Sequence, residues 1–497
     1  MAACEPAGNS HLKASEPDNE YTTEHLPPAQ PENRTEQGQL LQETLSSDPG
    51  NGSRVVHQAG LPEDVHAASV HVCEVMDKLG YSEAMVRYRQ EAYRKRDIRL
   101  KWVTTGSKGE GLSSPCESDT DVLLLKKNIL CKLPGHASLQ LPDIITVFIM
   151  DGEHCHPGHF WLELDHLGNA NITAPLFVHT NGKTYFSSQK LTERLKEIVQ
   201  SVPGPTYTVS GPAVKHEFES ERMDSVVALP IQQAMLSEWI SRPRHHSWPS
   251  PELIQEISKL QAYLVPVGCK GSETKHMEWR LCFLGEQKLT NSFTECQFKL
   301  YIILKFLMKE ELKPICNEMS SYIVKNIVFW FIESTQQELF YKETMFKCLL
   351  SCLQMLQQAI MDHHLSYYMF PGRNLLIGRI NQSQQQQLIA KLNELIQEGP
   401  RVILRCPKVL EALYNMSPTE LTEKSQRREE IEKLGLEWRY IMMKYIDLKD
   451  GWQQEEKDPD IITVKERIFD ILWPLWRLYP FERIFKILNK KNKDALS

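Results

Sequence analysis

The sequence predicts a mixed α/β protein, in which a strand-rich region is followed by a helical one. Between Trp102 and about Pro266, short apolar runs are separated by Gly and Pro, which is typical of strands. These runs are "DVLLL", "IITVFIM", "HFWLEL", "TYTVS" and "DSVVALPI". After Trp279, long apolar segments such as "FKLYIILKFLM" and "YIVKNIVFWFIE" predict helices as far as about Leu413.

Composition and periodicity divide the 497 residues into four parts. Residues 1–60 are rich in Pro, Glu, Gln, Ser and Asn, so we expect a disordered acidic tail. Apolar residues at helical spacing follow, and they predict one long helix or two helices joined near Gly80. With the strand-rich region they form a predicted domain at residues 61–266, and a helical domain is expected at 267–415. Residues 416–497 are predicted to be a helical extension, and the sequence gives no role for it.

The overall composition is that of an ordinary soluble globular protein, with 41% hydrophobic and 24% charged residues. No run of about 18 apolar residues predicts a transmembrane helix, and the first residues do not resemble a secretory signal. The twelve cysteines are scattered through apolar segments. We therefore expect reduced thiols and a cytoplasmic protein, with the nucleus as the other possible compartment.

Charge is distributed unevenly along the chain. The net charge is −7, and residues 1–60, with nine acidic and three basic residues, account for −6 of it. The remainder is nearly neutral, which argues against a uniformly basic nucleic-acid binder but leaves room for one basic face.

Two aspartates stand immediately before a predicted strand in "TTGSKGEGLSSPCESDTDVLLL". Residues i and i+2 of a strand point to the same face, so Asp119 and Asp121 would direct both carboxylates into one small volume. Like charges this close repel each other unless a cation lies between them, and Mg²⁺ prefers such oxygen ligands. A solvent-exposed loop that carries Asp-x-Asp is the alternative interpretation.

Two further features support a site for phosphate and metal. Gly106 and Ser107 precede the acidic pair, and a glycine turn with a hydroxyl can hold phosphate oxygens. Asp224 opens the predicted strand "DSVVALPI" and is the best candidate for the third acid that a two-metal site needs. It could also be an ordinary exposed acid at the end of a strand.

These segments resemble the Mab-21-like nucleotidyltransferases, the family of cyclic GMP-AMP synthase and its receptor relatives. "GSKGEGLSSPCESDTDVLLL" is similar to the active-site hairpin, and "SGPAVKHEFESERMDSVVALPI" to the segment with the third acid. "YLVP", "EWRLCF", "SSYIVKNIVFW" and "YYMFPGRNLL" follow in family order, so the resemblance covers roughly residues 61–415. It implies a bilobal nucleotidyltransferase fold, with an N-terminal spine helix, a catalytic lobe built on a mixed sheet and an all-helical C-terminal lobe.

The resemblance also implies roles for single residues. Asp119, Asp121 and Asp224 would hold two Mg²⁺ or Mn²⁺ ions and act in catalysis, although many family members have Glu at the first position. Gly106 and Ser107 would contact a nucleoside triphosphate, with ATP and GTP as the expected substrates. The other residues that resemble nucleotide contacts are Arg280, Glu286, Lys305, Ser321 and Lys325. Lys305 could instead be a lysine whose stem packs in an apolar helix, and Ser321 a helix cap.

The activity that the resemblance implies is synthesis of a cyclic dinucleotide second messenger for innate immunity, activated by nucleic acid. A catalytically silent scaffold of the same family is the main alternative, and transfer to an RNA or protein acceptor is another.

A basic helix face is the candidate contact for the nucleic acid, with Arg87, Arg94, Lys95 and Arg99 on the predicted spine helix. Such a run could equally be a solvated surface. The segment after "EWRLCF" contains Cys296 alone, so we expect no structural zinc. The DNA-sensing member of the family that this chain resembles carries a zinc insertion after the corresponding segment, so the resemblance implies double-stranded RNA rather than DNA as the activator.

Overall fold

The computed structural model describes residues 60–100, 102–115, 117–135, 142–169, 172–200, 207–218, 221–232, 235–445 and 457–476. Every described residue belongs to one compact unit, residues 57–497. The tail predicted at residues 1–60 therefore falls almost entirely outside the described residues. The predicted domain boundaries at 266 and 415 remain predictions.

Most strands of the described residues join one twelve-stranded sheet, in the path β1-β2-β10-β11-β12-β5-β4-β3 with β6 to β9 branching from it. The strands of this sheet are β1 (Val103–Thr105), β2 (Thr120–Leu125), β3 (Ile129–Lys132), β4 (Thr146–Asp151), β5 (His159–His166), β6 (Phe177–Thr180), β7 (Lys183–Phe186), β8 (Tyr207–Ser210), β9 (Ala213–Phe218), β10 (Glu221–Pro230), β11 (Ala262–Val265) and β12 (Trp279–Phe283). A separate hairpin pairs β13 (Ser366–Tyr367) with β14 (Phe370–Asn374). The five predicted strand runs are all confirmed as β2, β4, β5, β8 and β10.

Two N-terminal helices lead into the sheet. They are α2 (Val65–Met76) and α3 (Glu83–Leu100), joined by the single turn η1 (Asp77–Tyr81). Gly80 in that turn has φ +89°, a conformation that breaks a helix and that glycine adopts without strain. The prediction of two helices joined near Gly80 is therefore confirmed.

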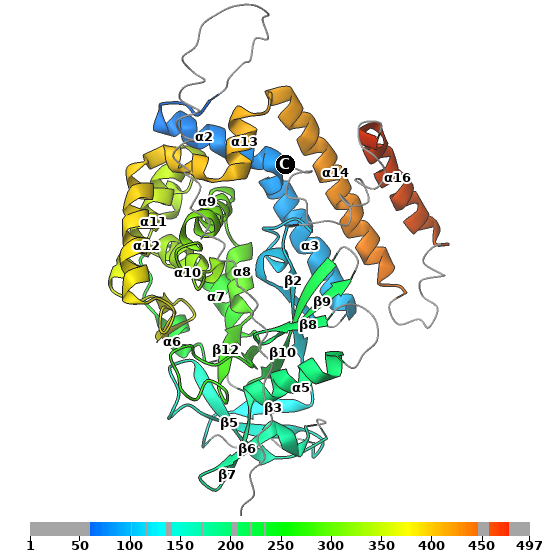
Figure 1. The fold of residues 1–497 in the computed structure, drawn as a ribbon, viewed down its shortest axis with the longest axis vertical. Helices are drawn as coiled ribbons and strands as arrows, with labels where there is room; N and C mark the ends of the chain where they lie inside the picture. The colour runs from blue at the N-terminus through cyan, green and yellow to red at the C-terminus, as the bar shows by residue number, and fades with distance from the viewer. Residues whose placement is uncertain are drawn as a thin grey trace, which may run out of the picture. The chain divides into compact units, whose positions relative to one another are not determined.

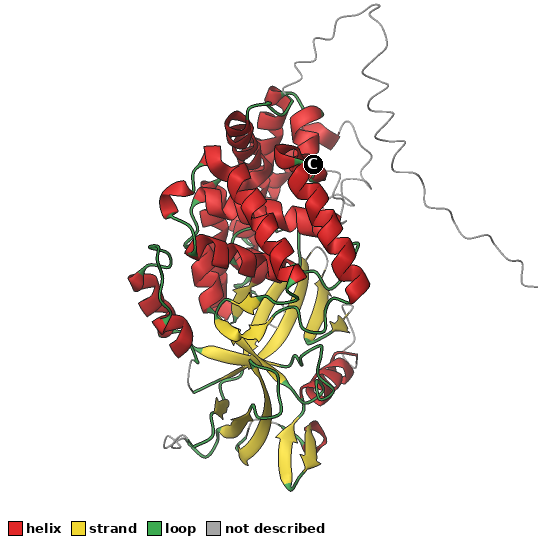
Figure 2. Ribbon diagram, turned by 90° about the vertical axis from the view of Figure 1, so that its left-hand side faces the viewer, coloured by secondary structure: helices red, strands yellow, loops and turns green. Residues whose placement is uncertain are grey.

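The helical region shares one hydrophobic core with the sheet. Figure 2 shows most of the helices gathered at one end of the strands. The main helices of this region are α8 (Gly285–Asn291), α9 (Glu295–Leu307), η3 (Met308–Leu312), α10 (Ser321–Glu333), α11 (Met345–Met361), α12 (Gln382–Gln397), η6 (Gly399–Arg405) and α13 (Pro407–Tyr414). Other helical elements are α4 (Gly106–Gly109), η2 (Ala174–Leu176), α5 (Ser188–Gln200), α6 (Ser237–Ser241), α7 (Pro251–Ser258), η4 (Gln337–Leu339) and η5 (Lys342–Thr344). The predicted α/β fold class is confirmed.

A buried lysine ties α9 to the N-terminal helices. Lys299 is fully buried, and its ammonium group lies 2.6 Å from a carboxylate oxygen of Asp77 and 2.5 Å from one of Glu295. It also donates to the backbone carbonyl of Cys73 at 2.9 Å. A buried ammonium group needs such partners, so this contact fixes α2 and η1 on the helical region.

The C-terminal extension packs along α3. It comprises α14 (Pro418–Met442) and α16 (Pro459–Trp476), and Figure 1 shows α14 beside α3 with α16 beyond it. The guanidinium group of Arg89 on α3 donates two hydrogen bonds to Glu432 on α14, at 2.5 and 2.9 Å. Both side chains are buried, so the pair holds the two helices together.

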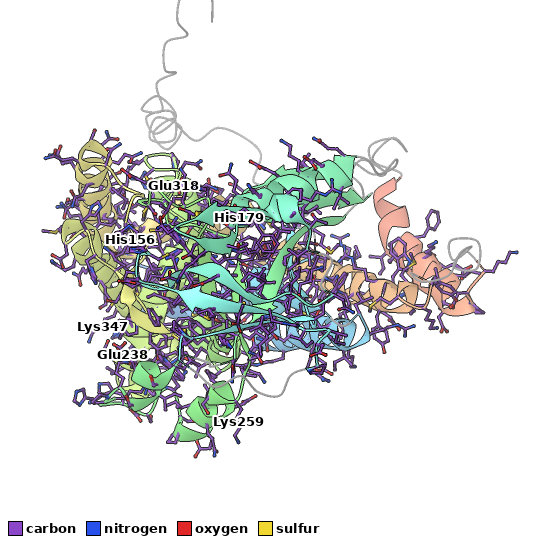
Figure 3. All side chains as sticks on the ribbon, turned by 90° about the horizontal axis from the view of Figure 1, so that it is seen from below. His156, His179, Glu238, Lys259, Glu318 and Lys347 are labelled. Carbon is purple, nitrogen blue, oxygen red and sulfur yellow. The ribbon has the colours of Figure 1, made fainter. Side chains whose placement is uncertain are left out.

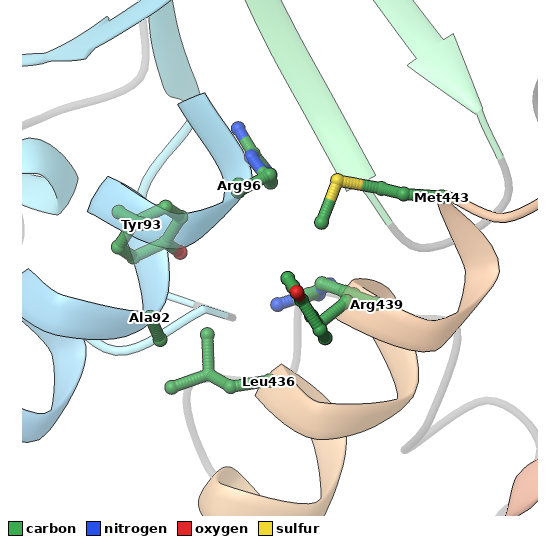
Figure 4. Close-up of a pocket in the computed structure, with 7 residues that line it drawn as sticks. Ala92, Tyr93, Arg96, Leu436, Arg439 and Met443 are labelled. Carbon is green, nitrogen blue, oxygen red and sulfur yellow. The ribbon is translucent and has the colours of Figure 1, made fainter. Parts of the chain in front are cut away.

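A small opening lies between α3 and α14 (Figure 4). It is lined by Ala92, Tyr93, Arg96, Leu436, Arg439, Tyr440 and Met443. Apolar and aromatic side chains fill most of this contact, which makes it a helix–helix seam.

The remaining general predictions concern thiols and membranes. The cysteines of the described residues, such as Cys73 and Cys352, are free thiols, as predicted. Within the described ranges, no helix combines the length and apolar character needed to span a bilayer. Exposed polar groups such as His179, Glu238, Lys259 and Lys347 lie at the periphery of the unit formed by residues 57–497 (Figure 3).

Candidate functional site

The three predicted acids meet at one edge of the sheet. β2 and β10 are parallel neighbours, and Asp121 lies directly opposite Asp224 in their register. Asp119 precedes Asp121 by two residues, at the point where the chain enters β2. The ammonium group of Lys215 reaches both Asp119, at 3.6 Å, and Asp224, at 3.1 Å. One ammonium group is thus shared by Asp119 and Asp224, so these two carboxylates lie close together.

Two basic side chains compensate the negative charge of this edge. Lys215 lies on β9 directly opposite Asp224, so the antiparallel pairing of β9 and β10 places it on the same face. Arg222 on β10 has a guanidinium nitrogen 2.8 Å from Asp119 Oδ1, an ion pair that lacks the geometry of a hydrogen bond. Both basic side chains are about one third exposed, so water partly screens these ion pairs.

The pKa of Asp121, the central acid, is raised above its ordinary value. Asp121 keeps a solvent-exposed edge, yet surrounding protein atoms and the neighbouring charges of Asp224 and Asp119 raise its pKa to about 6. The charge of Lys325, which lies in the helical region, acts in the opposite direction and lowers the pKa of Asp121. A carboxyl whose pKa is raised by two other carboxylates is a site where a further positive charge would be stabilised.

Gly106 begins α4 beside Asp121. It has φ +64°, and a Cβ at this position would lie 2.3 Å from Asp121 Oδ2. The absence of a side chain is therefore what lets the α4 turn approach the carboxylate.

Gly106→Ala is expected to lower the free energy of unfolding by more than the cost of placing an alanine in the left-handed conformation. The conformation alone costs about 1–2 kcal/mol, and the collision with Asp121 adds to it. Gly182→Ala is the matched control, because Gly182 has φ +73° and open space where its Cβ would lie. Chemical denaturation of both variants checks this, and equal losses would show that Asp121 tolerates the added methyl group.

The predicted phosphate contacts adjoin each other. Ser107 Oγ accepts a hydrogen bond of 2.6 Å from Lys305 Nζ, which reaches over from α9. Burial lowers the pKa of Lys305, although Glu110 and Asp121 counteract that effect. Lys305 therefore is not simply a surface lysine; its ammonium group is directed into the site.

Lys325 and Glu286 lie deeper, between the sheet and the helical region. Lys325 on α10 pairs with Glu110, directly after α4, and lies 3.8 Å from Glu286. Glu286 accepts hydrogen bonds from the hydroxyls of Tyr322, at 2.8 Å, and Tyr367. These charges hold the α4 turn against α10. Ser321 is exposed at the start of α10.

Arg280 lies at the far end of the same sheet face. It pairs with Val265 of β11, while Leu264 pairs with Leu229 of β10, so Arg280 shares the face of Ala228 and Asp224. Between the acids and Arg280, this face carries a small apolar cluster separate from the main core: Leu123, Ala228, Tyr263 and Val265, with Val226 and Cys282 at its border. An anionic end, an apolar floor and a cationic end thus follow one another.

His159 on β5 lies directly opposite Arg280. Burial and the charges of Arg373 and Arg280 lower its pKa to about 3. The imidazole of His159 binds a proton more readily in the unfolded chain than in the folded protein. The stability that the neutral imidazole contributes is therefore complete above pH 6.5 and is lost as the pH falls towards 3.

His159→Phe is therefore expected to reduce the loss of stability between pH 7 and pH 5 by about 2 kcal/mol, since one pKa unit corresponds to about 1.4 kcal/mol. Denaturant titrations at both pH values measure this, with the exposed His179→Phe as control. An unchanged pH dependence in His159→Phe would show that the imidazole is not protonated on unfolding.

The residues predicted to bind nucleic acid separate into two groups. Arg87 donates to the backbone carbonyls of Asn291 and Phe293 at 2.6 and 2.9 Å, so it serves an internal contact. Arg94, Lys95 and Arg99 are exposed on the second half of α3, where Arg94 and Lys95 also contact Glu91.

Sequence reasoning missed Lys215, Arg222, Glu110 and Arg373. A hairpin of β9 and β10 would have placed Lys215 opposite Asp224, and Glu110 follows the Gly106 turn closely. Arg373 lies on β14, and nothing in its local pattern indicates a contact with β5.

The acids fit a divalent metal ion in donor chemistry. Carboxylate oxygens are the ligands that Mg²⁺ and Mn²⁺ prefer, and Asp224 Oδ1 is buried without a hydrogen-bond partner. In the present side-chain arrangement, however, no three His, Cys, Asp or Glu residues of the described ranges are grouped to hold an ion. Lys215 and Arg222 would have to leave the carboxylates for an ion to bind.

Comparison with known protein families finds a match in the helical region. Residues 296–394 match the family model of the Mab-21 protein HhH/H2TH-like domain. The matched segment spans most of α9 to α12 and includes Lys305 and Lys325. This match supports membership of the Mab-21 family. No curated protein matches the chain.

Proposed function

We propose that this chain is a nucleotidyltransferase that joins two nucleoside triphosphates, ATP and GTP, into a cyclic dinucleotide of the cyclic GMP-AMP type. The observation that carries the proposal is the register of β2 and β10, which brings Asp121 opposite Asp224 beside the Gly106 turn. The Mab-21 match in the helical region supports the same assignment. The product would act as a signal in innate immunity, made in the cytoplasm or the nucleus.

In this proposal the chain's own residues bind and orient the nucleotides. The α4 turn with Ser107 and Lys305 receives the triphosphate, and the apolar floor with Arg280 receives the second nucleotide. Asp119, Asp121 and Asp224 would hold two Mg²⁺ or Mn²⁺ ions. When bound, such ions supply Lewis-acid activation of a hydroxyl and charge stabilisation at the phosphates.

The reaction is a substitution at the α-phosphorus. A ribose hydroxyl of one nucleotide forms a new P–O bond, while the bond to pyrophosphate breaks. The hydroxyl proton passes to one of the three carboxylates. A second round within the linear product closes the ring and releases a second pyrophosphate.

Double-stranded RNA is the proposed activator. Arg94, Lys95 and Arg99 are exposed on α3 and could contact the phosphate backbone. Binding of this kind weakens steeply as salt concentration rises.

A second candidate function is a catalytically silent Mab-21-type scaffold. The ion pairs of Lys215 and Arg222 with the acids favour it, because they balance the negative charge without a metal ion. Removing the acids from such a protein would affect stability alone.

Incubation of the full chain with all four nucleoside triphosphates and Mg²⁺ or Mn²⁺ distinguishes the two. Parallel reactions contain long double-stranded RNA, double-stranded DNA or no nucleic acid. A phosphatase-resistant dinucleotide that depends on RNA is the expected product. Absence of any product under all conditions would favour the scaffold, and a product formed equally with DNA would remove the preference for RNA.

A further inference from the structure

We propose that Arg373 and Arg280 together form a subsite for a phosphate group of the substrate, at the end of the sheet face away from the three aspartates. The proposal rests on the proposed function for the identity of the ligand. It adds Arg373, a residue of β14, to the nucleotide site.

Three contacts bring Arg373 next to Arg280. Gly158 has φ +78°, and a Cβ there would lie 3.1 Å from Arg373 Cδ. The carbonyl of Gly158 accepts a hydrogen bond of 2.9 Å from the amide of Leu281, the residue after Arg280. His159, which follows Gly158, lies opposite Arg280 in the sheet. The stem of Arg373 therefore lies against Gly158, whose carbonyl binds the neighbour of Arg280 and whose next residue pairs with Arg280.

Neither arginine has an acidic partner among the described residues. Arg373 is 6% exposed, its Nη1 has no hydrogen-bond partner, and its guanidinium group lies 5.3 Å from the ring centre of Tyr367. The nearby Arg379 differs, because it pairs with Glu318 at 3.5 Å. His159 Nδ1 is a second buried atom of this cluster without a partner.

Nearby acids do not compensate this positive charge. Glu286 already accepts bonds from Tyr322 and Tyr367 and lies near Lys325. Burial and the charge of Arg373 lower the pKa of Arg280, which is what two guanidinium groups without an anion produce. Arginine remains charged in proteins, so this arrangement costs stability until an anion arrives.

Phosphate is the anion whose chemistry fits best. Two guanidinium groups offer planar pairs of N–H donors that match phosphate oxygens, and a phosphate carries enough negative charge for both. The phosphate could belong to the triphosphate of the second nucleotide or to that of the linear intermediate.

The test compares full-length wild type with Arg373→Met, which keeps the length of the side chain and removes the charge. Calorimetric titration with inorganic tripolyphosphate, and with non-hydrolysable analogues of ATP and GTP, measures affinity. Denaturant titration without ligand measures stability. Arg401→Met, at an exposed arginine of η6, is the control for loss of one positive charge.

Arg373→Met is expected to weaken tripolyphosphate binding about 10- to 100-fold while leaving the ligand-free protein equally or more stable. A merely structural arginine would give the opposite pattern, namely lower stability and unchanged affinity, and that result would overturn the proposal. A loss confined to the nucleotide analogues would place Arg373 at the base or sugar of the nucleotide and would also overturn the proposal, whereas equal losses with tripolyphosphate would identify phosphate as the group it binds. If wild type binds tripolyphosphate through Arg373 but forms no product, the proposed function fails and this subsite stands.

Discussion

Replacement of Glu432 by alanine is expected to lower the free energy of unfolding by about 3–5 kcal/mol. The substitution leaves the guanidinium group of Arg89 buried without its carboxylate, since Arg89 is only 1% exposed. The remaining partner of that group is the carbonyl of Gly111, which accepts a hydrogen bond at 3.2 Å. Chemical denaturation followed by circular dichroism measures the loss.

Glu429→Ala is the matched control on the same helix. Glu429 pairs with Lys433, and both side chains are about two fifths exposed, so less than about 1 kcal/mol is expected. Equal losses in Glu432→Ala and Glu429→Ala would show that the buried pair has no special role.

The pair also gives the C-terminal extension a structural role. Arg89 connects Glu432 on α14 to the loop between α4 and β2, and Gln90 donates to the carbonyl of Glu110 in that loop at 3.0 Å. This loop leads directly to Asp119. The extension therefore supports the segment that positions the acids, by way of α3.

Asp224→Asn is expected to reduce dinucleotide synthesis by at least about 10²–10³-fold, the range seen when one charge-stabilising group is removed from an active site. The substitution keeps the shape of the side chain and removes one negative charge opposite Asp121. Stability should be unchanged or higher, because the repulsion that raises the pKa of Asp121 is relieved. Product formation and thermal unfolding are measured on the same preparation.

Asp143→Asn, at an exposed acid ahead of β4, is the control for loss of one carboxylate. If wild type is active and Asp224→Asn retains that activity, Asp224 is not part of the catalytic site. A loss of activity accompanied by unfolding would instead reflect the ion pair with Lys215.

The pattern of apolar runs predicted β2, β4, β5, β8 and β10, of which β2 carries Asp121 and β10 carries Asp224. Asp224 opens an apolar run and Asp119 and Asp121 precede another, so a parallel pairing of the two strands brings them together. Gly80 likewise marked the join between α2 and α3. These features depend on local sequence and on one strand pairing.

Contacts between distant segments could not be predicted in this way. Lys215 faces Asp224 only through the register of a hairpin, and Arg373 reaches β5 from the helical region through the packing at Gly158. The pair of Arg89 and Glu432 joins residues 343 positions apart. Such partners are fixed by tertiary packing, which periodicity does not record.

Binding of Mn²⁺ tests the central claim most directly. Electron paramagnetic resonance of free Mn²⁺ measures binding to wild type, Asp143→Asn and the double variant Asp121→Asn/Asp224→Asn, each without nucleotide, because a triphosphate would itself bind the ion. We predict saturable binding in wild type and Asp143→Asn, and its loss in the double variant. Equal binding in all three proteins, or none in wild type, would contradict a metal site at the edge of β2 and β10.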